Sequence, residues 1–229
     1  MPASSPMPDW QSVARTIDHT VIKTEATRSA IVQLCQEALR YEFQAVSLQP
    51  CYVALAASLL RGSPVRVGSV IGFPQGATLT TVKRFEAAEA IRAGAQELDM
   101  VLNVGQLKAG EGDLVQNDIA GVVQVAHEYG AILKVIIETP LLTEAEKTLA
   151  CELCVAAGAD YVKTATGLAG GGATVEDVRR MRAVVGTRAG VKAAGGIRTA
   201  AQAMAMLAAG ATRLGTSASA AIVRELGAP

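Results

Sequence analysis

The stretch AAGADYVKTATG, residues 156–167, contains the pattern that decides the fold. A helical pattern ends there at an Ala-Gly-Ala junction, and the run that follows, DYVKTAT, has the length of one strand. Ala-Gly-Ala recurs at 93–95 and 209–211, each time directly before another strand-like run. A glycine at such a junction supplies the left-handed residue that ends a helix before the chain enters a sheet.

Junctions of this kind recur along the whole chain. Their glycines are Gly62, Gly94, Gly130, Gly158, Gly190 and Gly210. With two earlier runs, the predicted strands are 16–20, 45–49, 65–72, 97–103, 132–138, 160–166, 191–196 and 212–217. The predicted helices are 26–40, 52–61, 78–93, 113–129, 143–157, 174–185, 199–209 and 217–226.

Eight strand–helix units predict an α/β protein. The strands are short and nearly continuous in apolar residues, which is typical of a parallel sheet covered on both faces. We expect a single-domain TIM (β/α)8 barrel over residues 1–229, with a short N-terminal extension. A doubly wound open sheet would show the same alternation. The barrel is favoured because polar residues fall at the carboxyl ends of the predicted strands, where barrel enzymes place their chemistry.

The composition excludes several kinds of partner. The 229 residues carry 21 basic and 21 acidic side chains, and only 3% are aromatic, so we expect no nucleic-acid partner. The start, MPASSPMPDW, lacks the basic and apolar regions of a signal peptide. The longest uncharged run, 43–60, is interrupted by Gln44 and Pro50, so we expect no membrane partner and a cytoplasmic location.

The four cysteines do not predict a metal site. Cys151 and Cys154 form a C-x-x-C, but they lie inside a predicted helix without a second pair. Only His19 and His127 could add imidazole ligands, whereas structural zinc needs four suitably spaced ligands. We therefore interpret both thiols as buried structural side chains.

Lysines inside apolar strands are the main anomaly of the sequence. Lys163 lies between Val162 and Ala165 in its run, and Lys192 lies between Val191 and Ala193. Buried ion pairs that fix the barrel register would be one explanation. Two ammonium groups on neighbouring strands cannot both stay protonated without cost, so one pKa must fall.

A lysine with a lowered pKa suggests amine catalysis. The neutral amine attacks an aldehyde or ketone, and the resulting iminium ion withdraws electrons from the carbon–carbon bond that breaks or forms. Asp99, on the predicted strand 97–103, is the candidate to relay protons through water. This chemistry requires no metal or other cofactor.

Glycines follow three consecutive strands. They are Gly167, Gly170, Gly171, Gly172, Gly195, Gly196 and Gly215. Backbone N–H groups at such turns can cradle a phosphate, although glycines also serve simply to turn tight corners. Arg198, just beyond the glycine pair, is either a phosphate ligand or a solvated residue at a helix start.

The chain resembles the DeoC-type deoxyribose-phosphate aldolases from about Ile17 to the last helix. The matching stretches are IDHT (17–20), IGFPQG (71–76), ELDMVLN (97–103), LKVIIET (133–139), YVKTATG (161–167), GGGAT (170–174), VKAAGGIRT (191–199) and RLGTSAS (213–219). The resemblance implies a cofactor-free class I aldolase on a TIM barrel, dimeric or tetrameric. It also implies the reversible cleavage of 2-deoxy-D-ribose 5-phosphate to D-glyceraldehyde 3-phosphate and acetaldehyde, in deoxyribonucleoside breakdown.

The resemblance also assigns roles to residues. Lys163 matches the lysine that forms the Schiff base, Lys192 the lysine that lowers its pKa and exchanges protons, and Asp99 the acid/base carboxylate. Asp18 and Lys134 match polar positions lining the same pocket. The substrate- and phosphate-binding region corresponds to Thr166, Gly167, Gly195, Gly196, Arg198, Gly215 and Ser217.

Two departures from the family pattern affect substrate tuning rather than the reaction type. Ser47 and Gln49 stand where the family often has Cys and Asn, and Ala218 replaces the second of two adjacent serines. Losing one hydroxyl near a phosphate weakens binding by about 1 kcal/mol if a hydrogen bond is lost. The alternative functions are another Schiff-base aldolase or transaldolase acting on a different sugar phosphate, and a sugar-phosphate sensor without catalysis.

Overall fold

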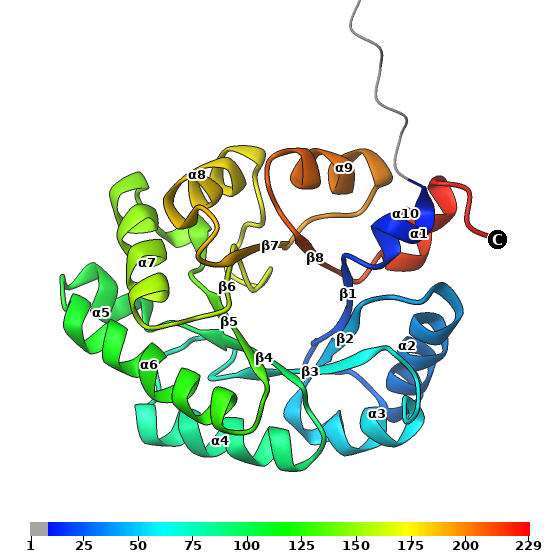
Figure 1. Cartoon of the computed structure of the whole chain (residues 1–229), viewed down its shortest axis with the longest axis horizontal. Helices are drawn as coiled ribbons and strands as arrows, with labels where there is room; N and C mark the ends of the chain where they lie inside the picture. Colours follow the sequence, from blue (N-terminus) through cyan, green and yellow to red (C-terminus); the bar gives the residue numbers. More distant parts are fainter. Residues whose placement is uncertain (1–8) are drawn as a thin grey trace, which may run out of the picture.

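Eight parallel strands close into a barrel in the computed structural model, which describes residues 9–229. The barrel is viewed along its length in Figure 1, with the helices forming an outer ring. The strands are β1 (Ile17–Val21), β2 (Ala45–Leu48), β3 (Arg66–Ile71), β4 (Glu97–Val101), β5 (Ile132–Ile136), β6 (Tyr161–Lys163), β7 (Gly190–Ala194) and β8 (Arg213–Thr216). Closure comes from the pairing of β8 with β1, for example Leu214 with Ile17. The predicted TIM barrel is confirmed, and an open sheet is excluded.

The helices follow the strands as the sequence predicts, with four short additions. They are α1 (Trp10–Ala14), α2 (Arg28–Tyr41), η1 (Pro50–Tyr52), α3 (Val53–Leu59), α4 (Thr80–Arg92), α5 (Val104–Lys108), α6 (Gly112–Glu128), η2 (Thr139–Leu141), α7 (Glu144–Ala156), α8 (Val175–Val185), α9 (Ala200–Ala208) and α10 (Ser219–Glu225). The capping boxes at Thr143 and Thr199 are present, and Thr174 caps α8. The short elements α1, η1, α5 and η2 were not predicted.

Gly190 differs from the other junction glycines. It is the first residue of β7 and lacks a positive φ; Gly186, with φ 56°, ends α8 instead. A Cβ at Gly190 would overlap the ring of Tyr161 on the neighbouring strand. The glycine is therefore explained by a close approach between strands rather than by a helix end.

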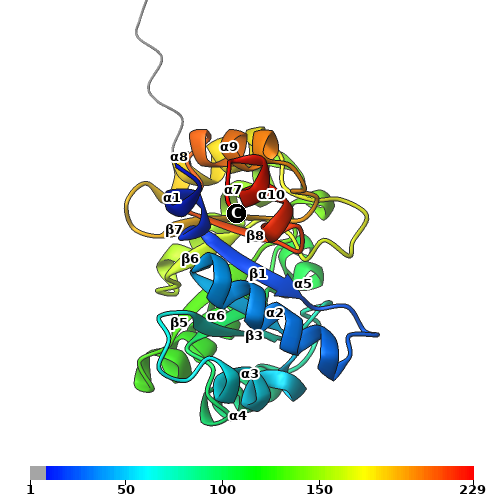
Figure 2. The ribbon, with the colours of Figure 1, turned by 90° about the vertical axis from the view of Figure 1, so that its right-hand side faces the viewer.

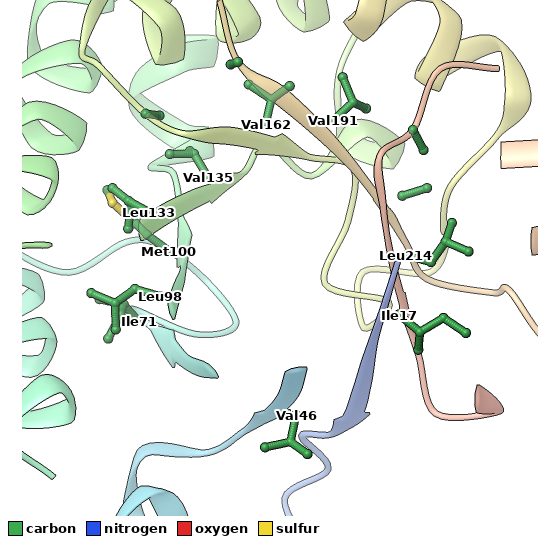
Figure 3. Close-up of a cluster of buried hydrophobic side chains, with 14 of the residues drawn as sticks. Ile17, Val46, Ile71, Leu98, Met100, Leu133, Val135, Val162, Val191 and Leu214 are labelled. Atoms are coloured by element: carbon green, nitrogen blue, oxygen red, sulfur yellow. The ribbon is translucent and has the colours of Figure 1, made fainter. Parts of the chain in front are cut away.

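The strands alternate between an apolar outer face and a charged inner face. Figure 3 shows Ile17, Leu98, Leu133, Val191 and Leu214 on the outer side of the strands, toward the helices. Their neighbours in sequence point the opposite way, since successive side chains of a strand alternate. Hydrophobic burial therefore joins strands to helices and leaves the barrel interior for polar groups.

The N-terminal segment adds one short helix. Figure 2 shows α1 beside α10, and the Trp10 ring contacts the Tyr41 ring of α2 edge-on at 6.5 Å. Most of the stretch in which we expect no signal peptide lies outside the described residues. Among the described residues, no helix is long and apolar enough to cross a membrane. Cys151 and Cys154 are free and buried, as predicted.

Candidate active site

Seven charged side chains meet inside the barrel. They are Asp18, Glu97, Asp99, Lys134, Lys163, Lys192 and Arg213. Each is at most 6% exposed. They come from six different strands, and pairs such as Asp99 on β4 with Lys192 on β7 can meet only across the barrel interior. Buried charges of this kind persist because each one has partners of opposite charge.

The carboxylate of Asp99 is the centre of this cluster. Its Oδ2 accepts hydrogen bonds from Lys163 Nζ at 2.7 Å and from Lys192 Nζ at 2.6 Å. Its Oδ1 accepts from Lys134 Nζ at 3.0 Å. Although burial opposes ionisation, the three ammonium groups hold the pKa of Asp99 well below its ordinary value. One carboxylate oxygen of Asp99 therefore lies within hydrogen-bonding distance of both lysines, where it can exchange protons with either.

Lys163 and Lys192 are register neighbours on β6 and β7. Burial lowers the pKa of Lys163 most strongly, the ammonium groups of Lys192 and Lys134 lower it further, and Asp99 opposes them. The resulting pKa is about 8, well below the ordinary lysine value of 10.5. The sequence-based expectation of one lowered lysine pKa is confirmed, but burial contributes more than the neighbouring ammonium.

Lys134 and Asp18 lie deeper in the barrel. Burial disfavours the ammonium of Lys134, but Asp99, Glu97 and Asp18 raise its pKa above the ordinary value. Lys134 Nζ is 2.6 Å from Glu97 Oε2, and Asp18 Oδ2 is 2.5 Å from Lys192 Nζ. Lys134 is therefore a permanent cation, whereas about a tenth of the Lys163 side chains are neutral at pH 7, far more than for an ordinary lysine.

A cavity of about 290 Å³ opens above Lys163 at the carboxyl ends of the strands. It is lined by Thr20, Val21, Ile22, Lys23, Lys163, Thr166, Gly167, Leu168, Ala194, Gly195, Gly196, Ile197, Arg198, Gly215, Thr216 and Ser217. Of the three lysines in the buried cluster, only Lys163 lines this cavity. The structure thus brings the predicted Schiff-base lysine together with seven residues of the predicted substrate- and phosphate-binding region, whereas Gly170, Gly171 and Gly172 do not line the cavity.

The loops around the cavity depend on close backbone approaches. A Cβ on Gly172 would overlap the carbonyl of Gly195, and Ala173 N–H donates to that same carbonyl at 3.0 Å. Arg198 and Ser217 are exposed at the rim. The loops after β6 and β7 therefore hold each other in place beside the cavity, with side chains at the rim free to meet a ligand.

The chemistry of this site resembles that of known aldolases. The family model described as DeoC/LacD family aldolase matches residues 12–224. The chain belongs to the DeoC/LacD aldolase family. It is 59% identical to a deoxyribose-phosphate aldolase from Thermococcus gammatolerans over 92% of this chain and 95% of the relative. It is 58% identical to one from Thermococcus kodakarensis, over 96% of this chain and 98% of the relative.

Solved structures agree with this assignment. The aldolase QR15 superposes with a TM-score of 0.89 at 40% identity, covering 93% of this chain and 95% of that one. A tetrameric deoxyribose phosphate aldolase from Aeropyrum pernix superposes with a TM-score of 0.88 at 35% identity, covering 94% and 91%. The chain is thus an aldolase, and aldolases are lyases that break carbon–carbon bonds.

Several expectations for this aldolase need correction. Asp18 and Lys134 were expected to line the pocket, but they lie beneath it in the buried cluster. Asp99 and Lys192 are central in their strands, and only Lys163 ends its strand. Side chains near the middle of a strand reach one another across the interior, whereas those at the end face the substrate cavity.

The last turn also differs from its prediction. Gly215 lies within β8, inside the predicted strand 212–217, and α10 begins at Ser219, not at Ser217. Ala218 occupies the N-cap position and offers no side-chain cap. The Ser217 hydroxyl is therefore not used for capping and stays available at the cavity.

The two departures at Ser47 in β2 and at Gln49, directly after β2, have different surroundings. Gln49 Nε2 donates to the carbonyl of Ile22 at 2.8 Å, which fixes part of the cavity wall. Ser47 is buried, and its hydroxyl has no hydrogen-bond partner among residues 9–229. Gln49 therefore supports the pocket, whereas Ser47 makes no polar contact that would explain its identity.

Sequence reasoning did not single out Glu97 and Arg213. Arg213 Nε is 2.9 Å from Asp18 Oδ1, and its Nη2 is 2.6 Å from Glu97 Oε2. Glu97 could have been identified from the sequence, because it lies two positions before Asp99 and residues two apart in a strand share one face. Within the described residues, no group of three His, Cys, Asp or Glu side chains is arranged to hold a metal.

Proposed function

We propose that this aldolase is a class I enzyme that cleaves 2-deoxy-D-ribose 5-phosphate to D-glyceraldehyde 3-phosphate and acetaldehyde, and catalyses the reverse reaction. The observation that carries the proposal is Lys163, a buried lysine with a pKa of about 8 beneath a cavity bordered by glycine loops. The names of the relatives from both Thermococcus species support the substrate.

The reaction begins at Lys163. Its neutral amine attacks C1 of the open-chain sugar aldehyde, and the carbinolamine loses water to give an iminium ion. The 3-hydroxyl then loses its proton and the C2–C3 bond breaks, releasing glyceraldehyde 3-phosphate. The bonding electrons move into the iminium and leave a two-carbon enamine on Lys163. Protonation of the enamine carbon and hydrolysis release acetaldehyde and restore the amine.

Asp99 and Lys192 are positioned to move the protons. Asp99 Oδ2 accepts a hydrogen bond from Lys163 Nζ and another from Lys192 Nζ. Asp99 therefore contacts the Lys163 amine directly, and Lys192 is linked to it through this oxygen. We assign Asp99 and Lys192 to proton exchange at the carbinolamine and the enamine carbon, through water in the cavity. Asp18 and Lys134 position this pair rather than contact the substrate. The iminium ion formed on Lys163 is the electron acceptor, so the scheme requires no cofactor.

The phosphate is assigned to the loops after β6, β7 and β8. The cavity is lined by Thr166, Gly167, Gly195, Gly196, Arg198, Gly215 and Ser217. Backbone N–H groups at glycine turns suit a phosphate dianion, and an exposed guanidinium at the rim adds charge. We place the enzyme in deoxyribonucleoside breakdown in the cytoplasm.

Borohydride trapping tests this proposal. Acetaldehyde and borohydride should add one stable ethyl group to the enzyme, and peptide mass mapping should find it on Lys163. Buried Lys83 and exposed Lys108 are internal controls for non-specific labelling. Labelling of another lysine, or none, would overturn the assignment.

A donor and acceptor screen identifies the alternative aldolase or transaldolase, because only the proposed enzyme uses acetaldehyde as donor. Deoxyribose phosphate held but not cleaved would indicate a sensor.

We also propose that the chain assembles as a homodimer or homotetramer. Leu79 is 71% exposed and Phe85 is 67% exposed, and both lie at or on α4, with exposed Leu114 on the adjacent α6. The tetrameric relative from Aeropyrum pernix supports this expectation. Light scattering tests it, and a monomer at micromolar concentration would contradict it.

A further inference from the structure

The barrel has a second, larger cavity at its opposite end. Its volume is about 780 Å³, and Lys163 is not among its lining residues. The first residues of six strands line it, which places it at the N-terminal mouth: Arg66, Glu97, Ile132, Tyr161, Gly190 and Arg213. Two of them, Glu97 and Arg213, also belong to the buried charged cluster. The cluster therefore extends from the substrate cavity to the other mouth.

Two chains of contacts connect this mouth to Lys163. On one side, Glu97 Oε2 lies 2.6 Å from Lys134, which lies 3.0 Å from Asp99. On the other side, Arg213 Nε lies 2.9 Å from Asp18, which lies 2.5 Å from Lys192, itself 2.6 Å from Asp99. Both chains end at the carboxylate that holds Lys163 at 2.7 Å.

The charges of the cluster balance in only one state of Lys163. With every group ionised, four cations (Lys134, Lys163, Lys192 and Arg213) face three carboxylates (Asp18, Glu97 and Asp99). When Lys163 is neutral, three cations face three carboxylates. An uncompensated buried charge is costly, so the cluster as a whole favours the neutral amine that catalysis needs.

We propose that Glu97 and Arg213 are positioning residues whose opposite charges set the protonation of Lys163 from the far end of the barrel, without contacting the substrate. This inference rests on the proposed amine chemistry of Lys163. Removing Glu97's charge leaves excess positive charge, which disfavours the ammonium of Lys163. Removing Arg213's charge has the opposite effect. Removing both restores the balance.

Glu138 is the other buried carboxylate near Lys163; its Oε1 accepts from Thr166 N–H at 3.0 Å, and it forms no ion pair with the cluster within residues 9–229. The remaining charged groups at the two cavities are partly or fully exposed to solvent. Lys23 and Arg198 lie at the rim of the substrate cavity, and Arg66, Arg188 and Asp160 line the opposite mouth. Solvent screens the exposed groups, whereas the buried cluster is screened much less. Glu97 is fully buried and Arg213 is 6% exposed, so their charges act on Lys163 with little screening.

The test is the pH at which Lys163 becomes reactive. The rate of ethylation by acetaldehyde and cyanoborohydride is measured against pH, with mass mapping of Lys163, for Glu97→Gln, Arg213→Met and the double variant. The midpoint should fall by about one unit in Glu97→Gln and rise by about one unit in Arg213→Met. The double variant should return to within a few tenths of the wild-type midpoint.

Controls separate this inference from structural damage and from the proposed function. Glu97→Asp keeps the charge and should keep the midpoint, even if its stability falls. Arg66→Gln changes an exposed side chain 3.9 Å from Glu97, so it should fold and raise the midpoint by a few tenths at low salt. Midpoints that do not move, or that move in the same direction in both single variants, would overturn the inference alone. Absence of ethylation at wild-type Lys163 would overturn both proposals.

Discussion

The contrast between two buried lysines, Lys83 and Lys163, explains why we propose only Lys163 as the reactive amine. Lys83 is fully buried on α4, with Nζ 2.5 Å from Asp118 Oδ2 and 3.1 Å from the carbonyl of Val101. It has a carboxylate partner outside the charged cluster and lines neither of the two barrel cavities. Lys163 shares its carboxylate with two other lysines and borders a cavity. A shared counter-ion and a route for substrate, more than burial itself, distinguish the reactive amine.

Lys192→Leu should leave the fold intact and reduce turnover at neutral pH at least about 100-fold. The ammonium of Lys192 lowers the pKa of Lys163, so its removal raises that pKa and leaves less neutral amine. Steady-state kinetics measure the loss, and circular dichroism verifies the fold. The exposed Lys108→Leu is the matched control. Turnover like the wild type in Lys192→Leu would remove the electrostatic role assigned to this residue.

Much of the charged centre was predictable residue by residue, because Lys163, Lys192, Lys134 and Asp99 interrupt apolar runs. Their depth was not predictable. Whether a side chain lines the cavity or lies below it depends on the stagger of neighbouring strands, such as the pairing of Lys192 with Arg213. Glu97 and Arg213 were missed for the same reason, since sequence spacing alone does not show which strands meet across a barrel.

The elements that shape the phosphate region are loops held by backbone contacts. Gly172 and Gly195 come from the loops after β6 and β7, and Ala173 N–H bonds to Gly195 across them. A second contact comes from Glu138, after β5, whose Oε1 accepts from Thr166 N–H at 3.0 Å. Three consecutive loops are thereby connected at the substrate cavity.

Gly172→Ala should raise KM for the phosphorylated sugar about tenfold or more, with a smaller effect on kcat. The added Cβ overlaps the Gly195 carbonyl, so the two loops must separate where we place the phosphate. Gly112→Ala makes the same chemical change at the start of α6, where the Cβ meets only ordinary contacts. Kinetics with deoxyribose 5-phosphate and with free deoxyribose check this. An equal loss with both substrates would contradict the phosphate assignment.

Sequence patterns identified the long elements and missed the short ones. Threonine caps and glycine ends gave α7, α8 and α9 to within a few residues. The five-residue helices α1 and α5 offer too few turns for an apolar period to be visible. The prediction that Gly190 ends a helix was wrong. A glycine before a strand can end a helix, but it can equally leave room for a neighbouring side chain, here the ring of Tyr161.

At the scale of the whole molecule, the hydrophobic core lies between strands and helices, and the barrel interior carries charge. This division separates stability from catalysis, because the apolar outer faces of the strands hold the helices. The interior then holds an amine whose lowered pKa opposes stability. Catalytic sites that depend on buried charge commonly have such a cost.

Lys163→Met should therefore stabilise the protein at neutral pH. The pKa of Lys163 is about 8 when folded and near its ordinary 10.5 when unfolded, so the wild type gains stability as pH rises through this window. Below pH 8 the buried ammonium costs about 3 kcal/mol relative to the neutral amine. The advantage of Lys163→Met over the wild type should be largest near pH 7 and shrink toward pH 10.5, by urea unfolding. A constant difference across this range would contradict the lowered pKa.

The central claim is that Lys163 is the reactive amine because the barrel interior lowers its pKa. Its most direct test is the pH dependence of its ethylation in the wild-type enzyme. The rate at Lys163 should rise through a single ionisation with a midpoint near pH 8, then level off. A rate that continues to rise toward pH 10.5, as for an ordinary lysine, would contradict the claim, and so would ethylation at any other residue.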